Sequence, residues 1–431
     1  ATWYLAVGAE GHGSLLVEDG GVAEADNGFA IGAQATGVGD AHVTGTGSRL
    51  EGAWNVLVGE HGEGELTVDN GGLVTSPGWL IVGHQNGSNG TLNVGPGGTA
   101  RTDQQVQIAD AADSAGDVTV SGAGAKLESG WWFGVGVGGH GTLTVGSGAL
   151  ADANNGITVG DASGGSGEVT VRGAGSTMQA GWGINVGNAG RGSLAVRDGA
   201  SFSAQNALEI GYNATGVGDV TVAGTNSSLS VQWHISVGAS GQGTLTVSDG
   251  GKVTAVSDIS VATIADGKGT VNISGGTVSV GAAVYVGGWW QQAGGEGVLN
   301  VNSGGTLNVP NLLRVYDAPG NVLNLRGGTI NTNALSFNGN PARFNWTGGT
   351  LHLTAGVTFD PLSVPPTGGI FGAARTISGT RKLKITGIEG LGGTGGFGLT
   401  VTNGGVHEVS DAIVINPNGA LHLHNGGTVI A

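Results

Sequence analysis

The feature that most constrains this chain is an internal repeat of about 25 residues. Trp3, Trp54, Trp131, Trp182 and Trp233 each stand five residues before a glycine, in segments such as WNVLVG and WHISVG. Three of the four gaps between these tryptophans are 51 residues long, and the fourth is 77. Similar segments that begin with asparagine lie between them, so two kinds of unit alternate. Self-similarity at a fixed period of this length is typical of a solenoid.

Each unit contains short stretches of alternating apolar and polar residues. In residues 54–78, WNVLVGEHGEGELTVDNGGLVTSPG, glycine clusters separate three such stretches. Alternation predicts strands and the glycines predict turns, with Val56, Val58, Leu66 and Val68 facing inward. The sequence therefore predicts an all-β fold, a right-handed parallel β-helix with about 25 residues and three short strands per coil. Coils would stack about 4.8 Å apart and bury their apolar faces collectively.

One outward position of the middle strand supports stacking in register. Its successive residues are mostly acids alternating with hydroxyls, and they are Ser14, Asp40, Glu65, Thr91, Asp117, Thr142, Glu168, Ser193, Asp219 and Thr244. Like charges stacked on neighbouring strands repel each other, and alternation roughly doubles their separation.

The regularity of the repeat divides the chain into three segments. Residues 1–280 are predicted to form regular coils that alternate between the tryptophan and asparagine types. Residues 281–358 are predicted to form looser coils with an insertion that carries Trp289 and Trp290. Residues 359–431 are predicted to form a modified C-terminal β region.

Composition excludes several classes of protein. Of 431 residues 92 are glycine, without the three-residue period of collagen, and none is cysteine, which excludes disulfides and thiolate metal sites. The net charge of −16 argues against a nucleic-acid partner. No apolar run approaches the roughly 18 residues of a transmembrane helix. Because Ala1 already lies inside a repeat, we expect that a signal peptide was removed or that the chain is an excised fragment.

The sequence carries no recognisable catalytic motif. HExxH, GxSxG, P-loop and CxxC patterns are missing, and the ten histidines are scattered. A polysaccharide-cleaving site would need clustered carboxylates beside basic residues, which are rare here. We therefore expect no enzymatic activity, no cofactor and no metal site.

The tryptophan row allows two interpretations. The tryptophans share parity with the inward valines and isoleucines, which predicts that they cap the inner stack at a coil corner. In that arrangement an amide ladder would form from Asn27, Asn155 and Asn206. The alternative is an exposed aromatic stripe for contact with glycans or a protein partner. The residues that fit exposed contact best are Trp132, Trp289 and Trp290.

A family resemblance accompanies the repeat. The segment GQGTLTVSDGGKVT, residues 241–254, resembles the passenger repeats of bacterial type V autotransporters and related Gram-negative surface proteins. The resemblance covers residues 1–280 well and the remainder loosely. It implies a secreted or cell-surface protein of a Gram-negative bacterium. It says little about activity, because such β-helical stalks carry adhesins, enzymes and inert spacers.

Both ends of the sequence read as coils without a polar cap, which predicts head-to-tail assembly. The predicted head surface comprises Trp3, Tyr4, Leu5, Val7, Leu15 and Val17. The predicted tail surface comprises Leu421, Leu423, Val429 and Ile430. Residues 1–69 hold eleven acids and one arginine, whereas residues 371–431 hold four basic and three acidic residues. An acidic head and a weakly basic tail would orient the contact.

Three functions remain open. The leading hypothesis is an extracellular structural protein that assembles with itself head-to-tail into a filament or surface fibre. The alternative is a monomeric autotransporter-like passenger that acts as an adhesin or stalk, with surface glycans or host and matrix proteins as partners. A polysaccharide-active β-helix enzyme is third.

Overall fold

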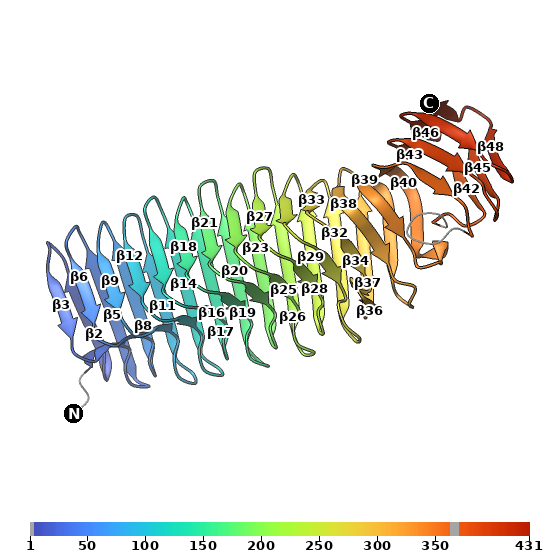
Figure 1. The fold of residues 1–431 in the computed structure, drawn as a ribbon. Coiled ribbons are helices and arrows are strands. Elements are labelled where there is room, and N and C mark those ends of the chain that lie inside the picture. The colour runs from blue at the N-terminus through green and yellow to red at the C-terminus, as the bar shows by residue number, and fades with distance from the viewer. Residues whose placement is uncertain (1–3, 363–369) are drawn as a thin grey trace. The chain divides into compact units, whose positions relative to one another are not determined.

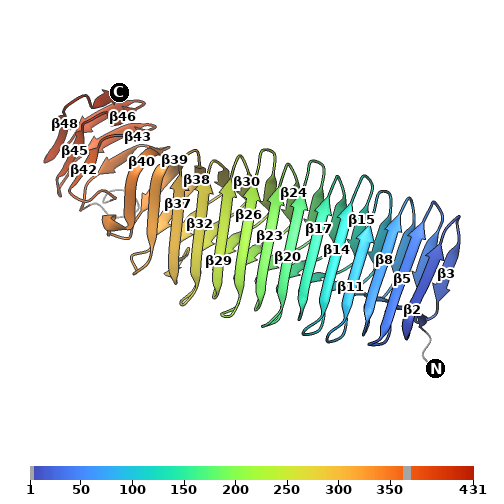
Figure 2. The same ribbon diagram turned by 180° about the vertical axis from the view of Figure 1, so that it is seen from behind.

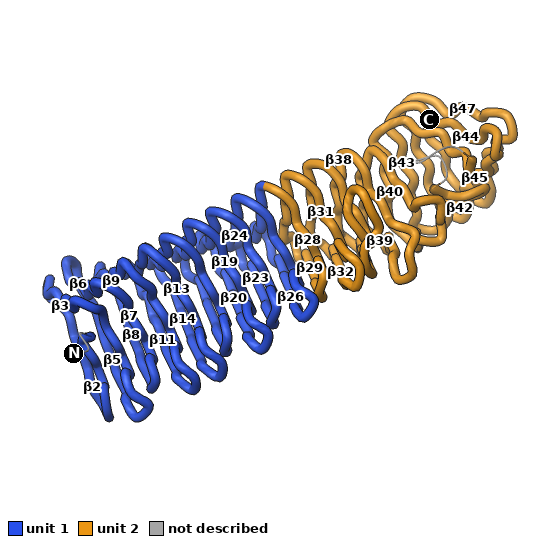
Figure 3. Tube along the Cα trace, turned by 60° about the horizontal axis from the view of Figure 1, so that its bottom comes forward, with its two compact units in different colours: residues 1–232 blue, residues 233–431 orange. Residues whose placement is uncertain are grey.

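The computed structural model describes residues 4–362 and 370–431, and nearly all of the β-strands in them pair in parallel (Figure 1). The chain forms two compact units, residues 1–232 and residues 233–431 (Figure 3). This division falls inside the segment expected to be regular, and the boundaries near residues 280 and 358 stay predictions. The described residues contain no helix with the length and apolarity needed to cross a bilayer.

The strands of the first unit fall into three series, and within each series neighbouring strands pair in parallel (Figure 2). The first series is β1 (Leu5–Val7), β4 (Gly28–Ile31), β7 (Asn55–Val58), β10 (Leu80–Val82), β13 (Val106–Ile108), β16 (Phe133–Val135), β19 (Ile157–Val159), β22 (Ile184–Val186) and β25 (Leu208–Ile210). The second series is β2 (Gly11–Val17), β5 (Gly37–Thr44), β8 (Glu63–Asp69), β11 (Asn89–Val94), β14 (Ala115–Ser121), β17 (His140–Gly146), β20 (Ser166–Arg172), β23 (Arg191–Arg197) and β26 (Val217–Ala223). The third series is β3 (Val22–Ala25), β6 (Arg49–Gly52), β9 (Leu73–Ser76), β12 (Thr99–Thr102), β15 (Lys126–Ser129), β18 (Leu150–Ala153), β21 (Thr177–Ala180), β24 (Ser201–Ala204) and β27 (Ser228–Val231).

The core of the first unit follows from alternation along each strand. Val56, Val58, Leu66 and Val68 are all fully buried, as predicted. Leu66 pairs with Leu92 on the next coil, so inward residues stack on inward residues about one repeat apart. These observations confirm a parallel β-solenoid whose coils are about 25 residues long.

The predicted row of acids and hydroxyls also stacks in register within the first unit. Asp117 pairs with Thr142, whose Oγ1 donates a hydrogen bond of 2.5 Å to the Asp117 carboxylate. Asp40 pairs with Glu65, and the amide of Asn93 donates a 3.0 Å hydrogen bond to Glu65. Hydroxyl residues thus separate Asp117, Glu168 and Asp219 along the row, whereas Asp40 and Glu65 are direct neighbours.

An inward glycine near the start of each second-series strand lets two series approach closely. At Gly167, which lies in β20, a Cβ atom would stand only 2.2 Å from the backbone oxygen of Val135. No side chain fits at that distance, so glycine is required where the second series passes over the end of the first.

The second unit begins with similar parallel strands and becomes less regular toward its C-terminal end. Its first strands are β28 (Ile235–Val237), β29 (Gln242–Ser248), β30 (Lys252–Ala255), β31 (Ile259–Val261), β32 (Lys268–Ser274), β33 (Thr277–Val280), β34 (Val284–Val286), β37 (Glu296–Asn302), β38 (Thr306–Val315), β39 (Val322–Ser336) and β40 (Phe344–Leu353). A short 3₁₀ helix, η1 (Pro341–Arg343), precedes β40. Register shifts interrupt β37, β38 and β39, where bends join strands that are separate in the first unit.

Side-chain amides form a ladder across four strands of the second unit. The amide of Asn300 donates to Asn272, that of Asn324 to Asn300 and that of Asn345 to Asn324, over 2.8, 2.8 and 3.0 Å. Each amide both donates and accepts, so the row satisfies itself from coil to coil.

The C-terminal strands form three short parallel groups around an aromatic core. They are β41 (Val357–Phe359), β42 (Ala374–Ile377), β43 (Arg381–Ile385), β44 (Ile388–Leu391), β45 (Phe397–Val401), β46 (Val406–Val409), β47 (Ala412–Ile415), β48 (Gly419–Leu423) and β49 (Thr428–Ile430). Phe359 lies 5.0 Å from Phe371 and 5.3 Å from Phe397, measured between ring centroids. Beside this core, His407 Nε2 lies 2.6 Å from a Glu389 carboxylate oxygen, and both side chains are fully buried.

Candidate functional surfaces

A column of residues runs along one corner of the first unit, between the third and first series of strands. We call it the corner column, and its members are Gln104, Trp131, Asn155, Trp182 and Asn206, one from each successive coil. Each backbone N–H donates to the carbonyl of the member before it, over 2.9, 2.8, 2.6 and 2.9 Å. The backbone therefore fixes the spacing of these five positions, with the two tryptophans two coils apart.

The tryptophans of this corner face solvent. The side chains of Trp131 and Trp182 are 52% and 59% exposed, and Trp54, in an earlier coil, is 59% exposed. The interpretation that they cap the inner stack was therefore wrong. Alternation of faces holds only within a strand, and Trp182 lies in a bend before β22 begins at Ile184.

Trp132, predicted to make exposed contacts, is half-buried against the next coil. A Cβ atom added at Gly156 would lie 2.5 Å from its ring, and its Nε1 donates a 2.8 Å hydrogen bond to Thr158. The absence of a side chain at Gly156 leaves the space that the ring occupies. Trp132 thus forms part of the surface beside Trp131 rather than projecting from it.

Acidic residues lie on both sides of the corner column. On the side of the first series the outward Asn185 is in register with Glu209. On the side of the third series Glu128 stands between Arg101 and Asp152. Partial burial of Asp152 raises the pKa of its carboxyl, and the charge of Glu128 raises that pKa further.

The predicted insertion in the second unit is a small antiparallel hairpin of β35 (Gly288–Trp289) and β36 (Gln292–Ala293). Trp290 at its turn is 54% exposed, whereas Trp289 is half-buried. The two rings meet edge to face with centroids 6.1 Å apart. The hydroxyl of Tyr316 donates to the carbonyl of Trp289, and this contact anchors the hairpin to the next coil.

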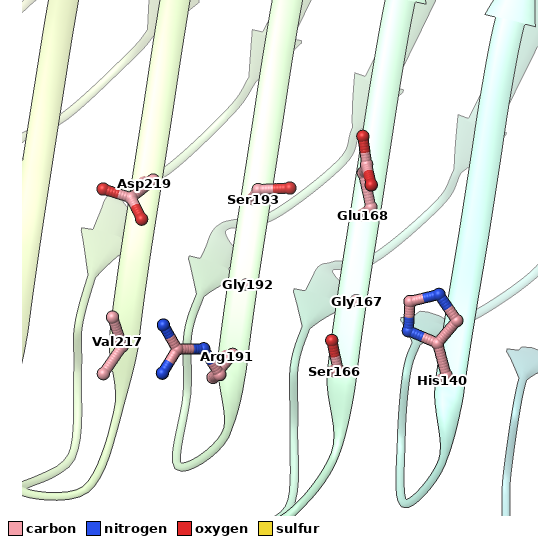
Figure 4. A pocket seen from close by; sticks show the side chains of 9 residues that line it. All are labelled: His140, Ser166, Gly167, Glu168, Arg191, Gly192, Ser193, Val217 and Asp219. Atoms are coloured by element: carbon pink, nitrogen blue, oxygen red, sulfur yellow. The ribbon is translucent and has the colours of Figure 1, made fainter.

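A shallow polar depression lies on the second series of the first unit (Figure 4). It is lined by His140, Ser166, Gly167, Glu168, Arg191, Gly192, Ser193, Val217 and Asp219. Glu168 and Asp219 stand two coils apart with Ser193 between them, a separation of about 10 Å along the strand-pairing direction. Both carboxylates are exposed. Within the described residues no group of three or more His, Asp or Glu side chains is placed to hold a metal ion.

The terminal coils expose part of the predicted assembly surfaces. At the head Trp3 lies outside the described residues, and Tyr4, Leu5 and Leu15 are half-buried. Val7 and Val17 are already buried, each 5% exposed, because the next coil covers them; they add little free surface.

At the tail Leu423 and Ile430 are 54% and 52% exposed, while Leu421 and Val429 are half-buried. Ile430 pairs with the outward Glu408, so it faces solvent rather than the inner stack. Ile415, 55% exposed, belongs to the same surface, and sequence reasoning missed it although its segment returns to the coil pattern.

Comparisons with known proteins give limited matches. No family model matches the chain. It is 32% identical over 130 residues to the uncharacterized lipoprotein YdeK of Escherichia coli K12, a match that covers 29% of this chain and 9% of that protein. Among solved structures it is similar to a TibA fragment described as hyper-glycosylated by TibC. That likeness has a TM-score of 0.39 and 19% identity, over 99% of this chain and 97% of the fragment.

Proposed function

We propose that this protein is a non-catalytic structural element of the bacterial exterior, built from right-handed coils of three strands each. The observation that carries the proposal is the stacking of fully buried aliphatic residues from coil to coil within each unit. Aliphatic side chains make up most of the buried core, and the polar depression on the second series is open to solvent. Such a framework supplies length and a regular surface rather than a reaction site.

Two observations support an extracytoplasmic location. The repeats resemble those of autotransporter passengers, in the segment at residues 241–254. The relative YdeK is named a lipoprotein, although the match spans only 9% of its length. The lack of cysteine is compatible with this location as well.

Assembly into a fibre is the use of the framework that the terminal coils favour. Leu423 pairs with Val401, which is fully buried one coil earlier, and Ile415 pairs likewise with the fully buried Leu391. The inward rows therefore reach the last described coil with their apolar side chains uncovered. A second copy of the chain, docking its first coil there, would continue both the backbone pairing and the apolar rows.

The fibre proposal is tested by sedimentation velocity and electron microscopy of the purified protein over a range of concentrations. The double variant Leu423→Pro with Val429→Lys removes a backbone donor and places a charge on the inward row. The matched control is Thr428→Lys, an outward position of the same strand. We expect fibres for the parent and the control, and 42.0 kDa monomers for the double variant. Monomers of the parent at every concentration would refute the proposal.

A monomeric stalk or adhesin is the second candidate, and the exposed tryptophans of the corner favour it. Single exposed apolar residues need no explanation, but large aromatic rings repeated at one corner are typical of a contact surface. A parent that stays monomeric at every concentration would leave this candidate as the one to test.

A further inference from the structure

The corner column sets its two tryptophans at a defined interval. Trp131 and Trp182 are separated by two steps of the backbone ladder through Asn155, which places them about 10 Å apart. In an extended chain of β-1,4-linked sugars, successive rings are turned over, so the same ring face recurs at every second sugar. The length of that disaccharide repeat is similar to the rise of two coils. Rings carried at this backbone interval would meet alternate sugars of one chain.

The chemistry of the column suits a sugar chain. Trp131 and Trp182 are each more than half exposed, and an aromatic face attracts the weakly positive C–H groups that line one face of a pyranose ring. Asn155 and Asn206 alternate with them, and side-chain amides both donate to and accept from hydroxyls. Rings and amides thus alternate along the line that the sugar chain would follow.

Charge narrows the class of glycan. The five members of the corner column carry no ionisable group. Glu128 and Asp152 lie beside it on the third series, and the whole chain has a net charge of −16. An anionic polysaccharide would be repelled, whereas a neutral one would not.

The column is also narrow. Gly181 and Gly183 flank Trp182, while Gly130 precedes Trp131 and the half-buried Trp132 follows it. A stable protein–protein contact needs roughly 800 Å² on each partner, which a strip one residue wide does not supply. A linear polymer fits such a strip better than a folded partner does.

We propose that the corner column binds an extended, neutral, β-1,4-linked polysaccharide, with Trp131 and Trp182 stacked on alternate sugar rings. The proposal goes beyond the structural function and rests on its extracellular location, but not on polymerisation. Trp132 lies on the side of the first series and widens the apolar floor beneath the chain. Asn185 on the same side offers a further amide group to sugar hydroxyls.

The test is calorimetric titration of the purified full chain with cellohexaose and chitohexaose. We expect measurable binding of at least one of them, and no binding of maltohexaose, whose α-links coil the chain, or of anionic oligogalacturonate. Trp131→Ala and Trp182→Ala should each weaken binding about tenfold, and the double variant should abolish it. The matched control is Trp290→Ala, since Trp290 is 54% exposed but lies on the hairpin.

Several results would overturn the proposal. The first is that the parent fails to bind either β-linked hexasaccharide, and the second is that it binds the anionic oligosaccharide more strongly than the neutral ones. The third is that the double tryptophan variant binds as tightly as the parent while having the same melting temperature. A parent dimer that the double variant dissociates would show that a second copy covers the column instead. The fibre-blocking variant Leu423→Pro with Val429→Lys should bind the sugar as the parent does, which separates this test from that of assembly.

Discussion

The buried pair of His407 and Glu389 allows a test of whether the two side chains stabilise each other. The test compares the unfolding free energies of the two single leucine variants with that of the double variant. Nε2 of the imidazole lies 2.6 Å from one carboxylate oxygen, both side chains are fully buried, and the other carboxylate oxygen has no hydrogen-bond partner in the described residues. Replacing His407 with leucine leaves a buried carboxylate unpaired, at a cost of about 3–5 kcal/mol. Glu389→Leu leaves a buried imidazole with Nδ1 3.4 Å from the carbonyl of Leu383 and Nε2 without its partner, and should cost about 1–3 kcal/mol.

The double variant should be more stable than either single variant. Two leucines of similar volume remove both buried polar groups together, and such exchanges range from neutral to about 4 kcal/mol stabilising. Urea unfolding followed by far-ultraviolet circular dichroism measures the effect. With a slope of about 3 kcal/mol per molar urea, a loss of 4 kcal/mol moves the midpoint by roughly 1 M. Hydrogen exchange in β43 and β46 checks that the change is local to this region.

The comparison of His407→Leu with the double variant decides the matter. If the two unfold at the same urea concentration, the carboxylate gains nothing from the imidazole, and the reasoning from a buried paired charge fails. If Glu389→Leu proves more damaging than His407→Leu, the carboxylate is not the group that suffers when the pair is broken.

The remaining predictions concern single positions. Gly167→Ala should lower the melting temperature sharply, because its Cβ would lie 2.2 Å from a backbone oxygen; an unchanged melting temperature would contradict the close approach. Leu194→Asp buries an unpaired charge and should cost several kcal/mol, whereas Thr246→Asp on an outward face should cost under about 1 kcal/mol; equal losses in urea unfolding would show the faces are misassigned. The Asp360 carboxylate accepts hydrogen bonds from the backbone N–H groups of Leu362, Gly395 and Thr394. These hydrogen bonds hold the pKa of Asp360 below its usual value despite partial desolvation. That stabilisation is present above the ordinary aspartate pKa and is lost as pH falls through the lowered one, so Asp360→Asn should lower the melting temperature at neutral pH and lose this effect in strong acid.

Much of the framework could be predicted from the sequence because two periods reinforce each other. The 25-residue repeat set which residues stack, and alternation within strands placed Val56, Val58, Leu66 and Val68 inside. The row that includes Asp117 and Thr142 followed from the same register. Both periods depend on strands that stack in register, so the predictions made from them hold where the chain forms such strands.

The errors and omissions lie at a bend between strands, in the segment where the repeat fades, and at the terminal coils. Trp182 shares parity with Ile184, but the bend between them breaks the relation, so the ring faces solvent. The pair of His407 and Glu389 joins two series in a segment where the repeat has faded, and no spacing in the sequence points to it. Val7 and Val17 were expected at a free surface, but one following coil is enough to bury them.

The alternation of tryptophan and asparagine along the corner column gives this protein a simple route to a longer array. A duplication of 51 residues inserts two coils, and the backbone pairing forces the copied ring to stand at the same interval from its neighbour as the original. Each duplication would add one more tryptophan in line with the others, and no further substitution would be needed to position its side chain. The gap of 77 residues between Trp54 and Trp131 corresponds to an odd number of coils, so these two rings do not stand at the two-coil interval. Recombination between repeats would then change the number of 51-residue units, and with it the number of rings that can bind one polymer at the same time.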